Sequence, residues 1–245
     1  MSIVISPEKE QQNKARYIEL VSSITRQGAN IPRLLTWLEA SDFFYAPASA
    51  KYHGAIRGGL CQHSLNVYDN LLMLRKDWGM ESIISDDTVK IVALFHDFAK
   101  VNFYTMEYKN KKIYSEKGKK HDECGSFDWV TVPGYGYIDE ASRFLYGNHE
   151  TTSEYMARQF VPLDYVESIA INHHHGGMSF DSAKDNMGSI WTRYPLALLL
   201  YMADSVSAFF NENDATAYTR VKEIVNGQDS ESTTPEVGNY DSVME

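Results

Sequence analysis

The chain has 245 residues, 43% of them hydrophobic, and a net charge of −10, which suits one domain with a full core. Five acidic residues and no lysine or arginine occur in residues 229–245, so the rest of the chain is only mildly acidic. This balance excludes a long basic surface for duplex DNA. The longest apolar run, residues 195–203, is too short to span a bilayer, so no membrane partner is expected.

The cysteine content indicates a reducing compartment. Two cysteines, Cys61 and Cys124, are too few for a disulfide framework in a chain of this size. The first residues also lack the basic segment and the long apolar core of a signal peptide. We therefore expect a cytoplasmic protein.

Helical patterns occupy the N-terminal part of the chain. We expect helices over residues 8–26 and 32–39, the second beginning with a proline in its first turn. Residues 41–59 are punctuated by glycine and proline and are expected to form a loop.

Two further helices carry the first polar residues of interest. Apolar residues from Leu60 to Trp78 recur at spacings of three and four, which predicts a long helix with His63 on its core side. Ser85 is a good N-cap for the next helix, which we expect to run to about Lys100.

The segment over residues 103–138 differs, because it is rich in tyrosine, lysine and glycine and alternates between polar and apolar residues. This pattern predicts a small antiparallel β-hairpin insert between helices. The lysines and tyrosines could hold phosphate and stack a base, but a solvated hairpin surface is the preferred interpretation. The lysines are Lys109, Lys111, Lys112, Lys117, Lys119 and Lys120.

Helices are expected to resume near His149 and to continue over residues 163–174, 190–210 and 214–225. Because Pro195 fits the first turn of a helix, the helix over 190–210 could truly start near Tyr194. The fold class is therefore mainly α. We expect one helical domain over residues 1–226, followed by an acidic, disordered tail over 227–245.

His96 and Asp97 are the most informative residues, because they follow the apolar run over residues 91–94. Polar side chains in such a place are costly unless something pairs with them, and a divalent metal is the simplest partner. Asp204 lies inside an apolar helix and raises the same question. Two alternatives need no metal. His96 and Asp97 could cap a helix end, and Asp204 could pair with a buried Arg or Tyr. With His63 on a core-facing stripe, the metal interpretation is favoured.

This ensemble resembles the HD-domain superfamily of metal-dependent phosphohydrolases. Residues 58–64 are similar to the segment that carries its first histidine, and residues 94–100 to its His-Asp signature followed by a lysine. Asp204 matches the final aspartate. The resemblance covers roughly residues 50–210 and implies an HD-domain helical bundle. It also implies that one metal is held by His63, His96, Asp97 and Asp204.

Many members of the superfamily add two histidines that complete a second metal site. His149 resembles the first of them. The second falls in the run His173, His174 and His175, among which the pattern alone leaves the choice open. The resemblance selects His174, two residues before a pair of glycines. The segment most resembles a branch with bacterial 3′-to-5′ exonucleases and uncharacterised phage and gut-bacterial proteins.

The resemblance also suggests catalytic residues. A metal lowers the pKa of bound water, and two metals can bind the phosphate oxygens as well. Asp97 is expected to bridge the metals, and Lys100 to contact phosphate, unless it is a solvated helix-end lysine. His53 and Arg57 could bind phosphate or protonate the leaving group; decoration of the surface is the alternative.

The sequence thus predicts a metal-dependent phosphohydrolase acting on a phosphomonoester or phosphodiester of a nucleotide or short single-stranded oligonucleotide. One or two divalent ions are expected, and the ligand types do not distinguish Mn, Fe, Mg, Ni, Co and Zn. A diiron oxygenase of a small organic substrate and a non-catalytic nucleotide-binding sensor are the alternatives. The oligomeric state is open.

Overall fold

The described residues of this computed structural model form two compact units, a helical unit and a strand unit. The helical unit takes the described residues of 3–105 and 135–213, and the strand unit takes those of 106–134. The expectation of a mainly α fold with a small antiparallel sheet is confirmed. The structure describes residues 5–144, 147–178 and 186–212.

The first two helices begin at side-chain caps, as their sequences favour. Helix α1 (Pro7–Ser22) follows Ser6, whose hydroxyl accepts a hydrogen bond from the backbone N–H of Lys9. Helix α2 (Ile31–Ala40) follows Asn30, whose side chain accepts in the same way. Helix α1 ends at Ser22, four residues before the end of the helix expected over 8–26.

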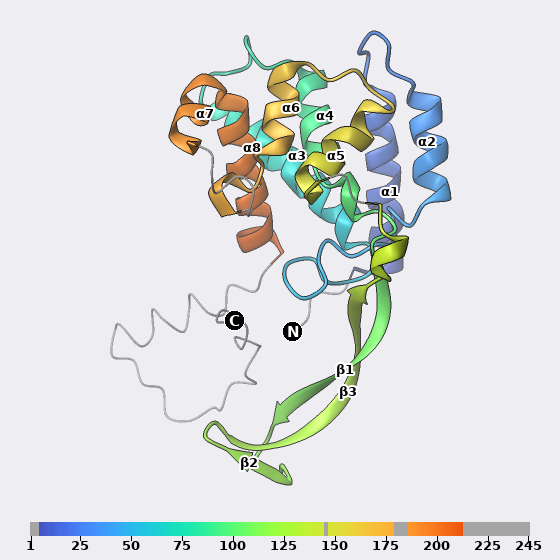
Figure 1. The fold of residues 1–245 in the computed structure, drawn as a ribbon, viewed down its shortest axis with the longest axis vertical. Helices are drawn as coiled ribbons and strands as arrows, with labels where there is room; N and C mark the ends of the chain where they lie inside the picture. The colour runs from blue at the N-terminus through green and yellow to red at the C-terminus, as the bar shows by residue number, and fades with distance from the viewer. Residues whose placement is uncertain (1–4, 145–146, 179–185, 213–245) are drawn as a thin grey trace. The chain divides into compact units, whose positions relative to one another are not determined.

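Helix α3 (Gly59–Asp77) is the central helix of the helical unit. It packs against α1, α4 (Asp86–Phe95) and α8 (Pro195–Val206), and Figure 1 shows it among them. His63 is buried on its apolar stripe, as the spacing predicts. The helix after Ser85 ends at Phe95 and continues as the 3₁₀ turn η1 (Phe98–Lys100).

A single helix over residues 190–210 is not what the chain forms. Helix α7 (Met187–Arg193) stops before Tyr194, whose backbone (φ −129°, ψ 76°) is not helical, because the following proline disfavours the helical region at this residue. Helix α8 then starts at Pro195 and passes into the π-helical segment η5 (Ser207–Asn211). The expected helix over 214–225 and the tail over 227–245 lie outside the described residues, and the single domain over 1–226 stays a prediction.

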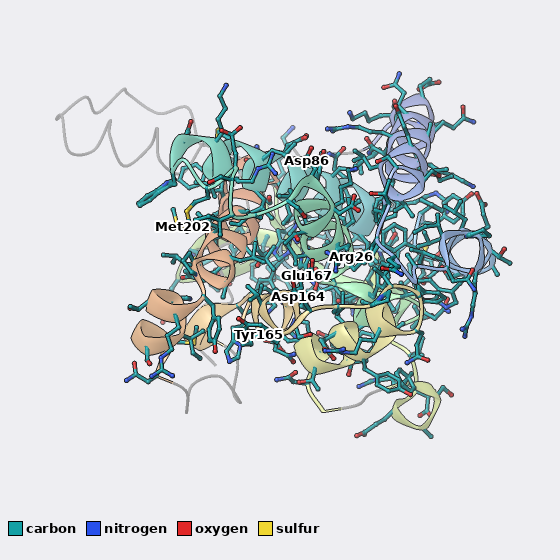
Figure 2. All side chains as sticks on the ribbon, turned by 90° about the horizontal axis from the view of Figure 1, so that it is seen from above. Arg26, Asp86, Asp164, Tyr165, Glu167 and Met202 are labelled. Carbon is teal, nitrogen blue, oxygen red and sulfur yellow. The ribbon has the colours of Figure 1, made fainter. Side chains whose placement is uncertain are left out.

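Helix α6 (Tyr165–Asn172) is fixed by a capping box between Asp164 and Glu167. The buried Glu167 carboxylate also binds Arg26, through contacts of 2.9 and 2.5 Å, and accepts the Thr88 hydroxyl at 2.9 Å. Figure 2 shows Arg26, Asp164 and Glu167 close together at this meeting point. Along the chain, η2 (Glu140–Ser142) and α5 (His149–Arg158) precede α6, and η3 (Gly176–Met178) follows it.

The strand unit contains most of a three-stranded sheet in the order β1-β3-β2. The strands are β1 (Tyr104–Tyr114), β2 (Lys120–Asp122) and β3 (Gly125–Tyr137), and β2 pairs antiparallel with β3. The sheet occupies the segment for which the hairpin insert was expected. Among the described residues, no helix combines the length and apolar character needed to cross a lipid bilayer.

Tyr17 of α1 binds the C-terminal end of α4. Its side chain is fully buried, and its hydroxyl donates to the carbonyl oxygen of Leu94 at 2.7 Å. We expect Tyr17→Phe to lower the free energy of unfolding by about 1–2 kcal/mol, because the buried carbonyl loses this donor. Urea unfolding measures the loss. The control Tyr165→Phe, at a tyrosine that is 69% exposed, should change little.

Candidate metal centre

The start of α3 brings two histidines together. Gly59 touches the preceding loop so closely that a Cβ there would lie 2.0 Å from the carbonyl oxygen of Gly54. The loop carries His53, whose ring centroid lies 4.9 Å from that of His63. Close backbone contact of this kind requires glycine.

Two buried imidazoles are oriented by backbone carbonyls. His96 Nδ1–H donates to the carbonyl oxygen of Ala93 at 2.8 Å, and His174 Nδ1–H donates to that of Ile171 at 2.7 Å. Each ring therefore turns its Nε2 atom inward. His96 Nε2 lies 3.3 Å from His63 Nε2, within hydrogen-bond distance.

Asp97 stands at the centre of these rings. Its Oδ2 atom lies 3.4 Å from His96 Nε2 and 3.6 Å from His63 Nε2. Its Oδ1 atom lies 3.7 Å from His174 Nε2, and Lys100 Nζ approaches Oδ2 to 2.6 Å. One carboxylate thus faces histidines on two sides.

Asp204 closes the cluster from α8. Its Oδ1 atom lies 3.0 Å from His63 Nε2 and 3.9 Å from His96 Nε2, and its Oδ2 atom lies 3.7 Å from His175 Nε2. His149, at the start of α5, has its ring centroid 4.6 Å from that of His175. The six residues expected to hold metal therefore gather in one part of the helical unit.

The donor set fits divalent metal ions. Three groups each have their ligand atoms within 4.8 Å of one another: His63, His96 and Asp97 in the first, His149, His174 and His175 in the second, and His53, His63 and Glu212 in the third. The Nε2 atoms of His149 and His174 are buried and form no hydrogen bond within the described residues. Buried polar atoms without a partner are rare, and imidazole nitrogen and carboxylate oxygen suit most first-row metals.

The electrostatics of the cluster match this chemistry. Burial raises the pKa of Asp97, but Lys100 and His96 outweigh it and hold the pKa well below its usual range. Burial, together with the neighbouring His175, lowers the pKa of His149 to about 4. An ionised carboxylate and a neutral imidazole are the forms that bind metal.

Burial also lowers the pKa of His63, but the carboxylates of Glu212 and Asp204 more than compensate and raise it to about 10. His63 therefore carries a second proton while no cation is bound. That proton must leave before Nε2 can act as a ligand.

The residues expected to act on substrate lie in different surroundings. Lys100 and His53 adjoin the cluster, and His53 Nε2 is buried without a hydrogen bond within the described residues. Arg57 instead donates to Glu10 at 3.0 and 3.2 Å, and its side chain is 62% exposed. Its expected role in catalysis stays a prediction.

Sequence reasoning missed three residues of this region or gave them a lesser place. It kept His175 only as an alternative to its neighbours. Glu150, which contacts the Nδ1 atoms of His149 and His175 at 3.2 Å, follows His149 directly and could have been found there. Glu212, whose Oε1 accepts from His63 Nδ1–H at 2.9 Å, lies 149 positions away, and no pattern in the sequence points to it.

Comparisons with known proteins give one match. The family model described as HD domain matches residues 60–208, which is more than half of the chain. No curated protein matches the chain, and no solved structure does.

Proposed function

The chain belongs to the HD-domain family, and on that premise we propose that it hydrolyses a phosphomonoester or phosphodiester of a nucleotide or short single-stranded oligonucleotide. Proteins of this family are in general metal-dependent phosphohydrolases. The observation that carries the proposal is the buried carboxylate of Asp97 between two groups of potential metal ligands.

We assign the metal-binding role to the six residues expected from the sequence, with His175, the third member of the second group, as a further donor. A divalent cation held there supplies Lewis acidity, which makes a water molecule more acidic and offsets negative charge on a phosphoryl oxygen. The six residues are His63, His96, Asp97, His149, His174 and Asp204.

Lys100 would hold the phosphate. Its side chain is 11% exposed, and the carboxylate of Asp97 raises its pKa despite burial. The ammonium group therefore stays charged at neutral pH and can pair with an oxygen of the substrate while it keeps Asp97 ionised. The same ion pair orients the carboxylate toward the histidines.

His53 would form one hydrogen bond to the substrate. Burial and the positive charges of His63 and Lys100 lower its pKa to about 4, so the imidazole is neutral at pH 7. Its buried Nε2 atom can then donate to or accept from an ester or sugar oxygen. The structure supports this role less strongly for Arg57, which is bound to Glu10.

Replacing Lys100 with alanine tests the phosphate contact. We expect turnover to fall by about 100-fold, because charge on the transferred group loses a positioned donor, while the metal content stays unchanged. Elemental analysis and steady-state kinetics measure the two quantities. Lys76→Ala, at an exposed lysine of α3, is the matched control and should leave both unchanged. Full loss of metal from the Lys100 variant would contradict the assigned role.

A metal-by-substrate screen tests the function as a whole. The protein is purified without oxygen, loaded in turn with Mn²⁺, Fe²⁺, Ni²⁺, Co²⁺, Zn²⁺ or Mg²⁺, and offered mononucleotides, cyclic nucleotides and short oligonucleotides. Release of phosphate or nucleotide that depends on the cation supports the proposal. A loaded protein that released neither product would overturn it, and oxygen consumption by an iron pair would favour the oxygenase instead.

We also propose a cytoplasmic location. It rests on the small number of cysteines, both of which are free thiols in the structure.

A further inference from the structure

The chain returns from α8 to α3 through the π-helical segment η5. Asn70 of α3 fixes this segment, because its side-chain amide donates to Ser207 Oγ and to Asn211 Oδ1, both at 2.8 Å. One turn earlier, Asn66 donates to Glu212 Oε1 at 3.0 Å. Two residues on one face of α3 thus bring Glu212 into the helical unit, and π-helical segments are frequent at functional sites.

Glu212 binds the outer nitrogen of a candidate ligand. Its Oε1 atom accepts from His63 Nδ1–H at 2.9 Å, while His63 Nε2 faces Asp204 at 3.0 Å. Both side chains are nearly closed to solvent, at 0% exposed for His63 and 6% for Glu212. The contact is therefore a charge-assisted hydrogen bond in a poorly hydrated place, where such bonds are strong.

His63 differs in this respect from the two imidazoles oriented by backbone. His96 and His174 direct their Nδ1–H groups to carbonyl oxygens of their own helices, which no substitution removes. His63 relies on a side chain, so its orientation and its basicity can be changed by one mutation. A carboxylate also raises the basicity of a ligating imidazole more than a neutral carbonyl does.

We infer that Glu212 is a positioning residue for the metal centre. It holds the Nδ1 proton of His63, fixes the tautomer with its lone pair on Nε2, and so strengthens the binding of a divalent cation. The inference rests on the proposed function only in that it takes His63 as a ligand. Hydrogen-bond partners of this kind typically change metal affinity by 10–100-fold.

The alternative is that Glu212 only attaches η5 to α3. The chain offers a control for this, because Asn70 fixes the same segment without touching His63. A purely structural role predicts that Asn70→Ala and Glu212→Ala weaken metal binding equally. A positioning role predicts that only substitutions of Glu212 do so.

Titration of the full chain with Mn²⁺ against a competing chelator separates these cases. We expect Glu212→Ala to raise the dissociation constant by about 10–100-fold, and Glu212→Gln by less, because its amide oxygen still accepts from Nδ1–H without the negative charge. Asn70→Ala should stay close to the wild type. Circular dichroism measures whether each variant is folded. If Glu212→Ala does not fold, Glu212→Gln still tests the inference, because glutamine keeps the shape of the side chain.

A second readout reports the tautomer directly. In the Zn²⁺-loaded protein, the Nδ1 proton of His63 should exchange slowly with solvent, and nuclear magnetic resonance should show faster exchange in Glu212→Ala. Wild-type affinity in both Glu212 variants, or equal weakening by Asn70→Ala, would overturn the inference alone. A wild type that bound Mn²⁺ but hydrolysed nothing would overturn the proposed function and leave this inference standing.

Discussion

Replacing Asp97 with alanine is expected to abolish metal-dependent turnover. Asp97 lies between His96 and His63 on one side and His174 on the other, so its loss removes a donor from the first group of ligands and a carboxylate that faces the second. We expect activity to fall by far more than the 10–100-fold that loss of an outer hydrogen-bond partner typically costs. The metal content, measured by elemental analysis, should fall as well.

Asp97→Asn is the matched variant for this experiment. It keeps the volume and one oxygen of the side chain but removes the charge that attracts the cation and pairs with Lys100. We expect it to be nearly as inactive as the alanine variant, while its circular dichroism spectrum matches the wild type. An alanine variant that kept its metal and its turnover would show that Asp97 is not a shared ligand.

The largest loss of stability is expected at Glu167, far along the chain from its main partner. Its carboxylate is 0% exposed and accepts four hydrogen bonds, two from Arg26, one from Thr88 and one from the backbone N–H of Asp164. It thereby connects α4, α6 and the residues that follow α1. We expect Glu167→Ala to lower the free energy of unfolding by about 3 kcal/mol. Removing one partner of a buried ion pair typically costs about 3–5 kcal/mol, and the loss is at the lower end because the unpaired Arg26 is partly hydrated.

The control for this substitution is an ion pair at the surface. Glu39 binds Lys14 at 2.7 Å, but the two side chains are 50% and 30% exposed. Glu39→Ala should change stability by less than about 1 kcal/mol, since exposed pairs contribute little. Chemical denaturation of both variants gives the comparison. Equal losses at the two positions would mean that burial adds nothing to the Arg26–Glu167 pair.

The inner part of the candidate site could be predicted from the sequence for a physical reason. His63, the His96-Asp97 pair and Asp204 each interrupt an apolar helical pattern, and burial makes an unpaired polar group unfavourable. Such residues are visible because their neighbours are apolar. The structure places each of the two histidines within 3.9 Å of both carboxylates.

The outer part could not be predicted in this way. Glu212 reaches His63 only because the helix after Pro195 widens into a π-helical segment, and no periodic pattern signals that change. The pairing of Arg57 with Glu10 depends on how the loop before α3 meets α1, which is a tertiary contact. The helix start near Tyr194 could be predicted, because Pro195 fits only the first turn of a helix, whereas the separate helix α7 before it was not expected.

The loop before α3 and the helix itself lie so close together that no Cβ atom fits between them at Gly59. A side chain at Gly59, even a single methyl group, would collide with the carbonyl oxygen of Gly54 and crowd the backbone nitrogen of Ala48. The loop would then have to retreat and carry His53 away from His63. The distance between His53, which would touch the substrate, and His63, which would hold the cation, thus depends on the absence of a side chain at Gly59.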